Sequence, residues 1–296
     1  HSKSRISRLF FLSNLSSKMK IAIQGIRGSF HHIVANKYYG DNIELAECMS
    51  FTDIPVLLNE GAVDSAVMAI ENSIAGAILP NYALIDEFDL SIEGEVYINI
   101  HHHLMGLKGQ HLNDIKEVWS HPMALLQCRK FFRNRPEIKL IEEKDTAEVA
   151  KRIQEKGLKG IAAIASKTAA DMYELDVLAD DIQTIKNNST RFFILKKNND
   201  SPYHPSKLGS IKDKASIKFV TKHDAGSLAE ILDIFGKHDL NLTKIQSLPI
   251  IDKPWSYAFF IDLVIDDFVL YKNALHLISK KVTHLKVLGE YHLNKL

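Results

Sequence analysis

The stretch DTAEVAKRIQEKGLKGIAAIA, Asp145–Ala165, contains a helix and a strand whose ends can both be identified. Asp145 can cap the helix, Glu148 three residues later completes a capping box, and Gly157 ends it. The strand Ile161–Ala165 that follows is apolar throughout, as a strand covered on both faces must be. A capped helix joined to such a strand predicts an α/β fold with a largely parallel sheet.

The same rhythm extends over residues 20–195, where short apolar runs alternate with helix-like segments. The expected strands are Lys20–Gln24, Ala66–Ile70, Val96–Leu104, Ile161–Ala165 and Arg191–Leu195. Residues 198–213 are polar and include two prolines, which is typical of a linker. We therefore expect an N-terminal extension, a first domain, a linker and a second domain, at residues 1–18, 19–197, 198–213 and 214–296.

The second domain has a different pattern of elements. Strands are expected at 215–221, 242–248, 257–264 and 285–291, with helices at 227–238 and 268–280. This βαββαβ order is that of a ferredoxin-like domain.

Composition narrows the class of protein. Of 296 residues, 46% are apolar and 25% are charged, with a net charge of +1, so neither a nucleic acid nor a membrane surface is expected as a partner. No apolar run approaches the roughly 18 residues of a membrane span. Two distant cysteines, Cys48 and Cys128, indicate a reducing compartment rather than a disulfide scaffold.

The first eighteen residues are basic, rich in serine and free of acids, which is compatible with an organellar transit peptide. Met19 is followed directly by the strand-like KIAIQ and resembles a natural start. We therefore favour an upstream extension or expression remnant, and a cytoplasmic protein.

Ligands of open α/β sheets bind beyond the carboxyl ends of the strands, so polar residues after buried strands are candidate contacts. In GIRGSF, Gly25–Phe30, two glycines permit a tight turn, and Ser29 can cap a helix whose free N–H groups attract anions. A plain strand-to-helix turn explains this motif equally well. Glu71, Asn72 and Ser73 follow the second strand, and three such side chains in a row indicate more than buried structure, although Ser73 alone is better explained as a helix cap.

A third candidate region is SHPMALLQC, Ser120–Cys128. Ser120 can cap a helix that has proline in its first turn, and Ser120, Ala124 and Gln127 share one helical face. That face would suit a cleft wall. The alternative is a capped amphipathic helix with Gln127 in solvent.

The fourth region is Thr190-Arg191, which precedes the apolar run Phe192–Leu195. Arg191 could clamp a carboxylate with its planar guanidinium, but an ordinary salt bridge is the simpler expectation.

His101, His102 and His103 suggest a metal site at first sight. Consecutive strand residues point to alternate faces, so the three cannot converge on one ion, and no metal is expected. His102 is in phase with the apolar positions Ile98 and Ile100, which predicts an inward histidine with satisfied hydrogen bonds.

Together and in this order, these regions resemble the prephenate dehydratase family, lyases of phenylalanine biosynthesis. The resemblance covers nearly the whole chain from Met19, through GIRGSF, IENSIAG, SHPMALLQC, KDTAEVA, AAIAS and NNSTRF. It implies two α/β lobes around a cleft, similar to periplasmic-binding proteins. The later lobe would hold roughly residues 102–185, and the returning chain would place Thr190 between the lobes. GSLAEILDIF and NLTKIQSLP are similar to an ACT domain, the effector-binding module of that family.

The resemblance implies a hydro-lyase that removes CO2 and water from prephenate, which requires hydrogen-bond donors rather than a nucleophile, metal or redox cofactor. Thr190 would assist the departing hydroxyl as a donor, or as a relay from an acid such as Glu71. The implied catalytic residues are Thr190, Glu71, Asn72, Ser120 and Gln127. The implied substrate-binding residues are Gly28, Ser29, Phe30, Ser73, Arg191 and Phe192.

For the ACT-like part, the resemblance implies L-phenylalanine as effector and a homodimer or homotetramer, because ACT effector sites form between subunits. The implied effector contacts are Ala225, Gly226, Ser227, Leu228, Asn241 and Leu242. Two motifs depart from the family, with Ala-Gly-Ser-Leu at 225–228 for Pro-Gly-Ala-Leu and Gln-Ser-Leu-Pro at 246–249 for Glu-Ser-Arg-Pro. Leu248 thus lacks the charge and five donors of arginine, so we expect weaker phenylalanine binding than is usual.

Two rival functions share these features. Arogenate dehydratase has the same motifs and acts on a substrate with an amine in place of the side-chain ketone; a genuine transit peptide would favour it. A non-catalytic bilobed binding protein with a sensor domain is the other rival, and the joint presence of Thr190, Glu71, Asn72 and Gln127 argues against it. No chorismate mutase helix bundle precedes the motifs, which favours a monofunctional enzyme.

Overall fold

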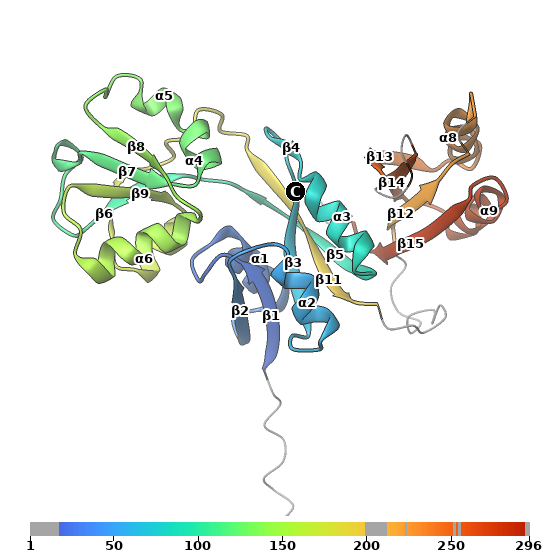
Figure 1. Cartoon of the computed structure of the whole chain (residues 1–296), viewed down its shortest axis with the longest axis horizontal. Helices are drawn as coiled ribbons and strands as arrows, with labels where there is room; N and C mark the ends of the chain where they lie inside the picture. The colour runs from blue at the N-terminus through green and yellow to red at the C-terminus, as the bar shows by residue number, and fades with distance from the viewer. Residues whose placement is uncertain (1–17, 199–211, 223, 251–252, 254–255, 294–296) are drawn as a thin grey trace, which may run out of the picture.

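The computed structural model describes residues 18–198, 212–222, 224–250, 253 and 256–293. It has a mixed α/β fold with three sheets arranged along the long axis of the molecule (Figure 1). Nearly all of the expected N-terminal extension and most of the expected linker lie outside the described residues.

The first sheet lies in the middle of the molecule and has the strand order β2-β1-β3-β11-β5, with β4 paired to β3 (Figure 1). Its strands are β1 (Met19–Gln24), β2 (Ile43–Cys48), β3 (Ser65–Asn72), β4 (Gly76–Ala77), β5 (Leu90–Asn99) and β11 (Ser189–Lys197). Its helices are α1 (Phe30–Tyr39), α2 (Asp53–Asn59) and α3 (Leu79–Glu87), and we call this part the first lobe.

The second sheet, in the green part of Figure 1, has the order β10-β6-β9-β7-β8. Its strands are β6 (His103–Gly106), β7 (Glu117–Ser120), β8 (Lys139–Glu142), β9 (Ile161–Ala165) and β10 (Asp176–Ala179). Together with the 3-10 helix η1 (Leu112–Asp114) and helices α4 (Pro122–Gln127), α5 (Arg129–Phe132), α6 (Thr146–Lys156) and α7 (Lys167–Met172), it forms the second lobe. Asp145 caps α6 and Gly157, at φ 58°, ends it, as the sequence predicts.

Both lobes contain mixed sheets, so the prediction of a largely parallel sheet is wrong. In the first lobe β1 is parallel to β2 and β3, whereas β11 is antiparallel to β3 and β5. In the second lobe β7 is parallel to β8 and β9, and β6 is antiparallel to β9 and β10. The antiparallel pairs of β11 arise because β5 carries the chain out of the first lobe and β11 brings it back.

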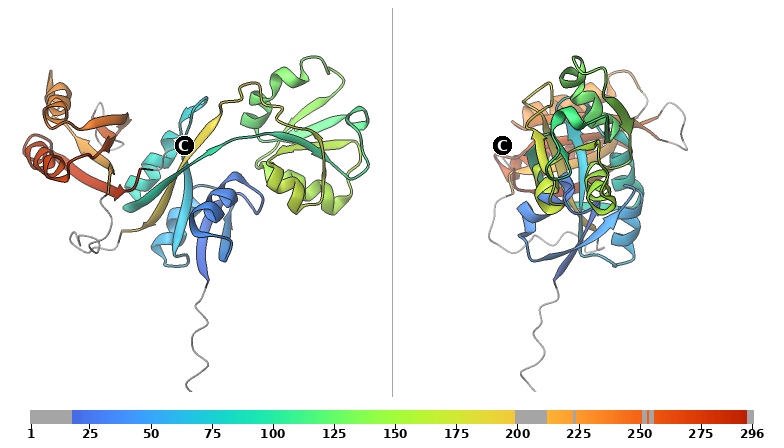
Figure 2. Two further views of the ribbon diagram at one scale, coloured as in Figure 1. Left: turned by 180° about the vertical axis from the view of Figure 1, so that it is seen from behind. Right: turned by 90° about the vertical axis from the view of Figure 1, so that its left-hand side faces the viewer.

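Two crossovers, residues 100–102 and 180–188, connect the lobes and run side by side (Figures 1 and 2). The Ile100 amide donates to the Asn188 carbonyl at 2.7 Å, and the Ile182 amide donates to the His102 carbonyl at 2.8 Å. The expected single strand over residues 96–104 is therefore wrong, because its two halves belong to different sheets and are separated by a crossover.

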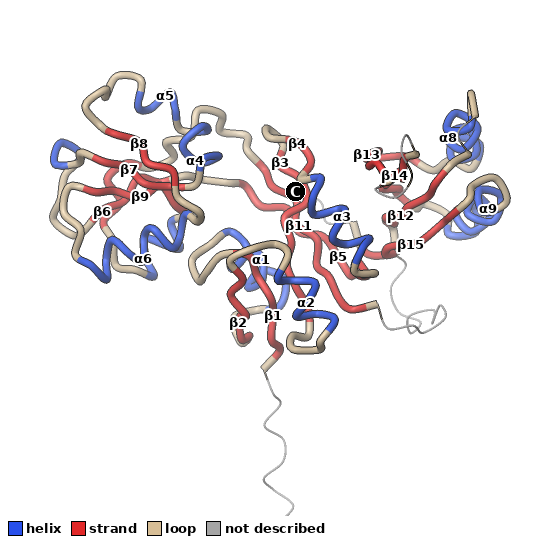
Figure 3. The backbone as a smooth tube through the Cα atoms, in the orientation of Figure 1, coloured by secondary structure: helices blue, strands red, loops and turns tan. Residues whose placement is uncertain are grey.

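The third sheet, which with its helices we call the C-terminal unit, has the antiparallel order β13-β14-β12-β15. Its elements are β12 (Lys214–Val220), α8 (Ser227–Lys237), β13 (Asn241–Pro249), β14 (Tyr257–Val264), α9 (Phe268–Ser279) and β15 (His284–Tyr291), which follow the expected βαββαβ order. The two helices lie on one face of this sheet (Figure 3). The other face packs on the first lobe, where Phe260, Leu288 and Tyr291 share a hydrophobic core with Met68 and Phe193.

The third sheet and the first sheet are in close contact at one glycine. A Cβ added to Gly289 of β15 would lie 2.1 Å from the carbonyl oxygen of Ile92 in β5, so only glycine permits this approach. Among the helices that the structure describes, none is long and apolar enough to span a lipid bilayer.

Candidate active site

A cavity of about 300 Å³ lies between the first and second lobes. The first lobe contributes side chains near the end of β1, the end of β3, the start of β11 and the start of α1. The crossover contributes Ile100 and His102, and the second lobe contributes α4 and the start of α6. A cavity of this size suits a small organic molecule. The lining residues are Gln24, Ser29, Phe30, His31, Phe51, Ala69, Asn72, Ala75, Ile78, Ile100, His102, His121, Met123, Ala124, Gln127, Lys144, Asp145, Thr146, Thr190 and Phe192.

Strand direction places Thr190 at this cavity. The sequence predicts that Thr190 precedes its strand, but β11 begins at Ser189, so Thr190 belongs to the sheet. Because β11 is antiparallel to β3, the start of β11 lies beside the end of β3, and Thr190 pairs in register with Asn72. The hydroxyl and the amide thus reach the same edge of the sheet from segments more than a hundred residues apart.

An irregularity between β3 and β11 decides which neighbouring side chains face the cavity. Arg191 pairs with Glu71 but Phe192 pairs with Ala69, so Ile70 is an extra residue on β3. Such a bulge shifts the alternation of faces by one position. Asn72 therefore faces the cavity and Glu71 faces away, whereas strict alternation from Ala69 would put Glu71 in the cavity.

The orientation of the Asn72 side chain is fixed by the backbone. Its Oδ1 accepts from the amides of Ile74 at 3.0 Å and Ala75 at 2.9 Å, so its Nδ2 must be the donor. That Nδ2 donates to the Thr190 Oγ1 at 2.9 Å and to the Asn188 Oδ1 at 2.7 Å. Because the Thr190 oxygen already accepts, its own proton can be donated to a molecule in the cavity.

The same order of hydrogen-bond donors and acceptors continues into the second lobe. Asn188 is fully buried and donates through Nδ2 to the Gln127 Oε1 at 2.9 Å. The His102 Nε2 lies 2.9 Å from the same Oε1, so that nitrogen carries the hydrogen of a neutral imidazole. We call Thr190, Asn72, Asn188, Gln127 and His102 the polar chain, and it joins both lobes and both crossovers.

The histidines of the cavity wall are neutral. Burial lowers the pKa of His31 to about 3 and that of His102 to about 4. The His31 Nε2 accepts from the Ala69 amide at 3.3 Å, which requires an unprotonated nitrogen. The expectation that His102 is fully satisfied is wrong, since its buried Nδ1 has no hydrogen-bond partner among the described residues.

The second lobe supplies charged side chains to the cavity lining. Among the described lining residues, Lys144 supplies a cation and Asp145 a carboxyl, and both lie at the start of α6. Burial raises the pKa of Asp145, whose Oδ1 accepts from the Glu148 amide at 2.8 Å. The motif predicts the helix cap but not the place of Lys144 in the cavity, although polar residues just before a helix start are a usable signal for such a site.

Several predicted site residues do line the cavity. They are Thr190, Asn72 and Gln127 from the catalytic set, and Ser29, Phe30 and Phe192 from the substrate-binding set. Ser29 also caps α1, as predicted, by accepting from the His32 amide at 3.3 Å.

The remaining residues of these two sets lie outside the cavity lining. Gly28, at φ 89°, lies against the second lobe, where an added Cβ would be 3.1 Å from the Ala169 Cα. Its carbonyl accepts from the Ser166 Oγ at 2.6 Å, so this glycine permits close packing of the lobes. The Ser73 Oγ accepts from the Ser189 amide at 2.9 Å and ties β3 to β11 rather than capping a helix.

Ser120 is fully buried and donates to the Ile164 carbonyl at 2.7 Å, which ties the second sheet together. The expectation that it caps α4 is wrong, because the cap is His121, whose Nδ1 accepts from the Met123 amide at 3.2 Å. Ser120 is the last residue of β7 and its side chain points into the sheet.

Glu71 and Arg191 face the C-terminal unit. Glu71 pairs with Lys244 at 2.7 Å, and Arg191 pairs with Glu95 at 2.7 Å and Asp262 at 2.5 Å. The simpler expectation of a salt bridge therefore describes Arg191. In the C-terminal unit, residues 225–228 line a separate hollow of about 700 Å³ between β12 and α8, while Asn241 and Leu242 begin β13 and are not among its described lining residues.

Two α/β lobes joined by paired crossovers, with a cavity between them, define a protein of the periplasmic-binding-protein-like fold. A prephenate dehydratase from Arthrobacter aurescens in complex with L-Phe has this fold, with a TM-score of 0.81 at 25% identity over 93% of this chain and 90% of that one. A structure described as GqqA, a novel type of quorum quenching acylase, also has a TM-score of 0.81 at 25% identity, over 93% of this chain and 98% of that one.

Residues 21–200 match the model of the prephenate dehydratase family, and the chain belongs to that family. The bifunctional chorismate mutase/prephenate dehydratase of Aquifex aeolicus is 35% identical over 94% of this chain and 75% of its own length. The chloroplastic arogenate dehydratase/prephenate dehydratase 2 of Arabidopsis thaliana is 35% identical over 93% of this chain and 73% of its own length. The chain is therefore a hydro-lyase, as its motifs indicate.

Proposed function

We propose that the cavity between the lobes converts prephenate to phenylpyruvate, CO2 and water. The observation that carries this proposal is the fixed orientation of Asn72, which makes the Thr190 oxygen an acceptor and leaves its proton to be donated. A leaving hydroxyl needs such a donor. Preorganised donors aimed at developing charge are commonly the largest single contribution to catalysis.

The reaction is a movement of electrons through the ring of the substrate. The bond to the ring carboxylate breaks, CO2 departs, its electron pair makes the ring aromatic, and the carbon–oxygen bond of the ring hydroxyl breaks. Negative charge therefore develops on the departing oxygen, where the Thr190 hydroxyl donates. Phe30 and Phe192 line the cavity and give the ring an apolar surface.

At least one of the two substrate carboxylates needs a charged partner, which the uncharged polar chain does not supply. We assign one to Lys144 together with the first turn of α1 behind Ser29, because Lys144 is a cation of the lining and free helix N–H groups attract anions. Gln127 has its Oε1 occupied by Asn188 and His102, so its Nε2 is the end that can donate to substrate.

The departing hydroxide takes up one proton, which solvent supplies, and leaves as water. Glu71, the acid that the sequence suggests as its source, lies on the reverse face of β3 and is paired with Lys244. We therefore assign to Thr190 the role of hydrogen-bond donor and not that of a relay from Glu71.

The test is absorbance-monitored formation of phenylpyruvate from prephenate by the full chain. We expect one CO2 released for each phenylpyruvate formed, without added cofactor. A chain that binds prephenate but leaves it unchanged would match the non-catalytic rival and end the proposal.

A second candidate substrate is arogenate. The specific observation in its favour is Asp145, a carboxyl in the cavity wall that could receive the substrate's ammonium group. Parallel assays of prephenate and arogenate decide between the two. If arogenate is the better substrate, Asp145→Asn should lower kcat/KM for arogenate more than for prephenate.

We further propose that residues 19–197 form the catalytic domain and 214–296 an ACT-type regulatory domain of a homodimer or homotetramer that binds L-phenylalanine. The βαββαβ order and the hollow beside residues 225–228 support this assignment. Because Leu248 lacks the charge of arginine, we expect weak phenylalanine binding. Calorimetric titration measures it, and tight binding with inhibition at equally low concentration would contradict the expectation.

A further inference from the structure

The strand pair that carries Thr190 and Asn72 has charged neighbours on its reverse face. Glu71 precedes Asn72 in the chain, and Arg191 follows Thr190. Arg191 and Glu71 pair with one another in register, and both face the C-terminal unit. The ends of β3 and β11 are thus held between the cavity on one side and the sheet of the C-terminal unit on the other.

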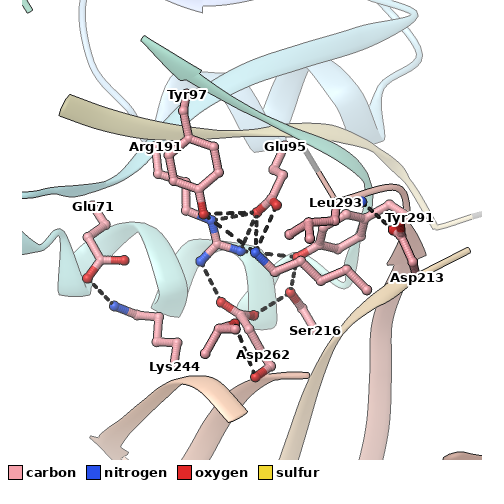
Figure 4. Close-up of polar contacts among 12 residues, drawn as sticks. Glu71, Glu95, Tyr97, Arg191, Asp213, Ser216, Lys244, Asp262, Tyr291 and Leu293 are labelled. Atoms are coloured by element: carbon pink, nitrogen blue, oxygen red, sulfur yellow. Dashed lines mark hydrogen bonds and ion pairs between the residues drawn. The ribbon is translucent and has the colours of Figure 1, made fainter. Parts of the chain in front are cut away.

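Arg191 takes part in a closed ring of hydrogen bonds with three residues of the C-terminal unit, which we call the arginine ring (Figure 4). It donates through NH1 to the Asp262 Oδ2 at 2.5 Å and through NH2 to the Tyr291 hydroxyl at 3.1 Å. The Ser216 hydroxyl donates to the Asp262 Oδ1 at 2.5 Å and lies 2.6 Å from the Tyr291 hydroxyl. Because Ser216 gives its proton to Asp262, Tyr291 must donate to Ser216. Arg191 thus donates to Asp262 directly and also through Tyr291 and Ser216, and the two paths close the ring.

The charges around the arginine ring are balanced. The Arg191 Nε donates to the Glu95 Oε2 at 2.7 Å, and the Lys214 Nζ donates to both oxygens of Glu95, at 2.8 and 2.9 Å. Two cations therefore meet two carboxylates, and all these side chains, with Ser216 and Tyr291, are at most 4% exposed. Burial alone would lower the pKa of Arg191, but the nearby charge of Asp262 raises it well above its usual value, so the guanidinium stays charged.

The sheet holds Thr190 differently on its two sides, because β11 pairs regularly with β5 from Ser189 to Ile194 but irregularly with β3. The bulge between β3 and β11 interrupts the regular ladder beside Arg191, one residue after Thr190. A guanidinium holds its donors in a rigid planar fork, so partners on three sides fix the backbone that carries it. Misplacing a reacting group by about 1 Å can cost about a hundredfold in rate.

We propose that Arg191 is a positioning residue for Thr190, and that Asp262 and Tyr291 of the C-terminal unit hold it in place. The C-terminal sheet then forms the back wall of the active site within the same chain. This inference rests on the proposed function, because it concerns the placement of the hydroxyl that assists the departing group.

The competing explanation is that the arginine ring only docks the C-terminal unit. Two other ion pairs across the same interface distinguish the explanations. Lys218 of β12 pairs with Asp86 of α3 at 2.5 Å, and Lys286 of β15 pairs with Asp89 just after α3. Neither pair involves β3 or β11, so Lys218→Gln and Lys286→Gln are matched controls for docking.

The experiment measures kcat, KM for prephenate and Tm for the full chain and its variants. We expect Asp262→Asn to lower kcat at least about tenfold and Tyr291→Phe, which keeps the charges and the packing, about threefold, with KM within about twofold of wild type. Lys218→Gln and Lys286→Gln should change kcat less than twofold. Unchanged kcat in Asp262→Asn and Tyr291→Phe, or equal losses in the controls, would overturn the inference.

The double variant Arg191→Met/Asp262→Asn separates position from stability. It removes one cation and one carboxylate, so Glu95 and Lys214 remain as a balanced pair. We expect its Tm to recover relative to Arg191→Met while its kcat stays at least about tenfold below wild type. If kcat recovered together with Tm, the arginine ring would serve only to stabilise the fold and would not position Thr190. A wild-type chain that converts neither prephenate nor arogenate would instead end the proposed function, and this inference with it.

Discussion

The two faces of the strand pair β3 and β11 differ in the kind of polar group that they carry. The cavity face has uncharged groups, Asn72 and Thr190, with a proton left to donate. The reverse face has Glu71 and Arg191, whose charges are matched by Lys244, Glu95 and Asp262.

This difference follows from the energetics of burial. An unmatched buried charge costs several kcal/mol, whereas a neutral hydroxyl or amide needs only its hydrogen bonds. Charges are therefore stable where their partners belong to the protein, and neutral donors are stable in a cavity whose partner arrives from solvent. The lesson for this family of folds is that a charged side chain beside a catalytic residue need not face the substrate.

The largest effect is expected from removing the donor of the cavity face. Thr190→Val keeps the shape of the side chain and removes the hydroxyl, so we expect kcat/KM for prephenate to fall about 10²–10³-fold, or about 3–4 kcal/mol. Phenylpyruvate formation measures this loss, and Thr190→Ser, which keeps the hydroxyl, should retain most of the activity. More than about a tenth of wild-type turnover in Thr190→Val would remove Thr190 from the mechanism.

The next largest effect on kcat is expected from disturbing the order of donors and acceptors in the polar chain. In Asn188→Asp the carboxylate can still accept from Asn72 but can no longer donate to Gln127, so we expect kcat to fall about 10–100-fold. Burial raises the pKa of such a carboxyl, and its protonated form can donate, so activity should recover in part as pH falls. The exposed neighbour variant Asn187→Asp is the control, and a pH profile identical to wild type in Asn188→Asp would contradict the assigned polarity.

A smaller effect is expected at the cation of the cavity. Lys144→Gln removes a charge that is exposed to solvent, so we expect KM for prephenate to rise roughly five- to tenfold, or about 1–1.4 kcal/mol, with a smaller change in kcat. The rise should shrink at high salt because exposed charges are screened. Steady-state kinetics at two salt concentrations measures it. Lys139→Gln, an exposed lysine outside the cavity, serves for comparison, and equal KM values in the two variants would argue against a carboxylate at Lys144.

The smallest effect concerns the neutral histidines of the cavity face. Burial holds the pKa of His31 at about 3, below its unfolded value near 6.5, so the unfolded chain binds the proton first and stability falls as pH decreases through 6.5. Between pH 7 and pH 6 this histidine should remove about 0.7 kcal/mol of the free energy of unfolding. Urea titrations at both pH values measure the loss, and His31→Gln should lack it. An equal pH dependence in that variant would mean that His31 is charged in the folded chain.

Much of the fold could be predicted from local patterns. The cap at Asp145, the stop at Gly157 and the buried strand Ile161–Ala165 are visible in the sequence, because capping and burial on both faces leave direct marks in residue type. The expected strand over residues 96–104 failed for the opposite reason. Residue types alone do not show where β5 ends and β6 begins, because the apolar pattern continues through the crossover between the two sheets.

For the cavity, the sequence brought Thr190, Asn72 and Gln127 together through the resemblance to a family. The direction of Glu71 and Arg191 could not be predicted, because it depends on the bulge at Ile70 and on a third sheet that approaches from the far side. Asn188 lies in the motif NNSTRF and Lys144 in KDTAEVA, yet neither could be recognised as a site residue from the sequence. Their importance arises from contacts between lobes, which one-dimensional spacing does not contain.

The position of β11 affects how this polypeptide can fold while the ribosome synthesises it. It lies between β3 and β5 in the first sheet, yet the whole second lobe is synthesised before it, and that lobe's strands all come from residues 103–179. Pairings between distant segments form slowly, because a long loop must close first. On the ribosome we therefore expect the second lobe to assemble while the first still lacks an inner strand. The segment that completes that sheet also carries Thr190, so we expect no turnover of substrate by a chain that ends before β11.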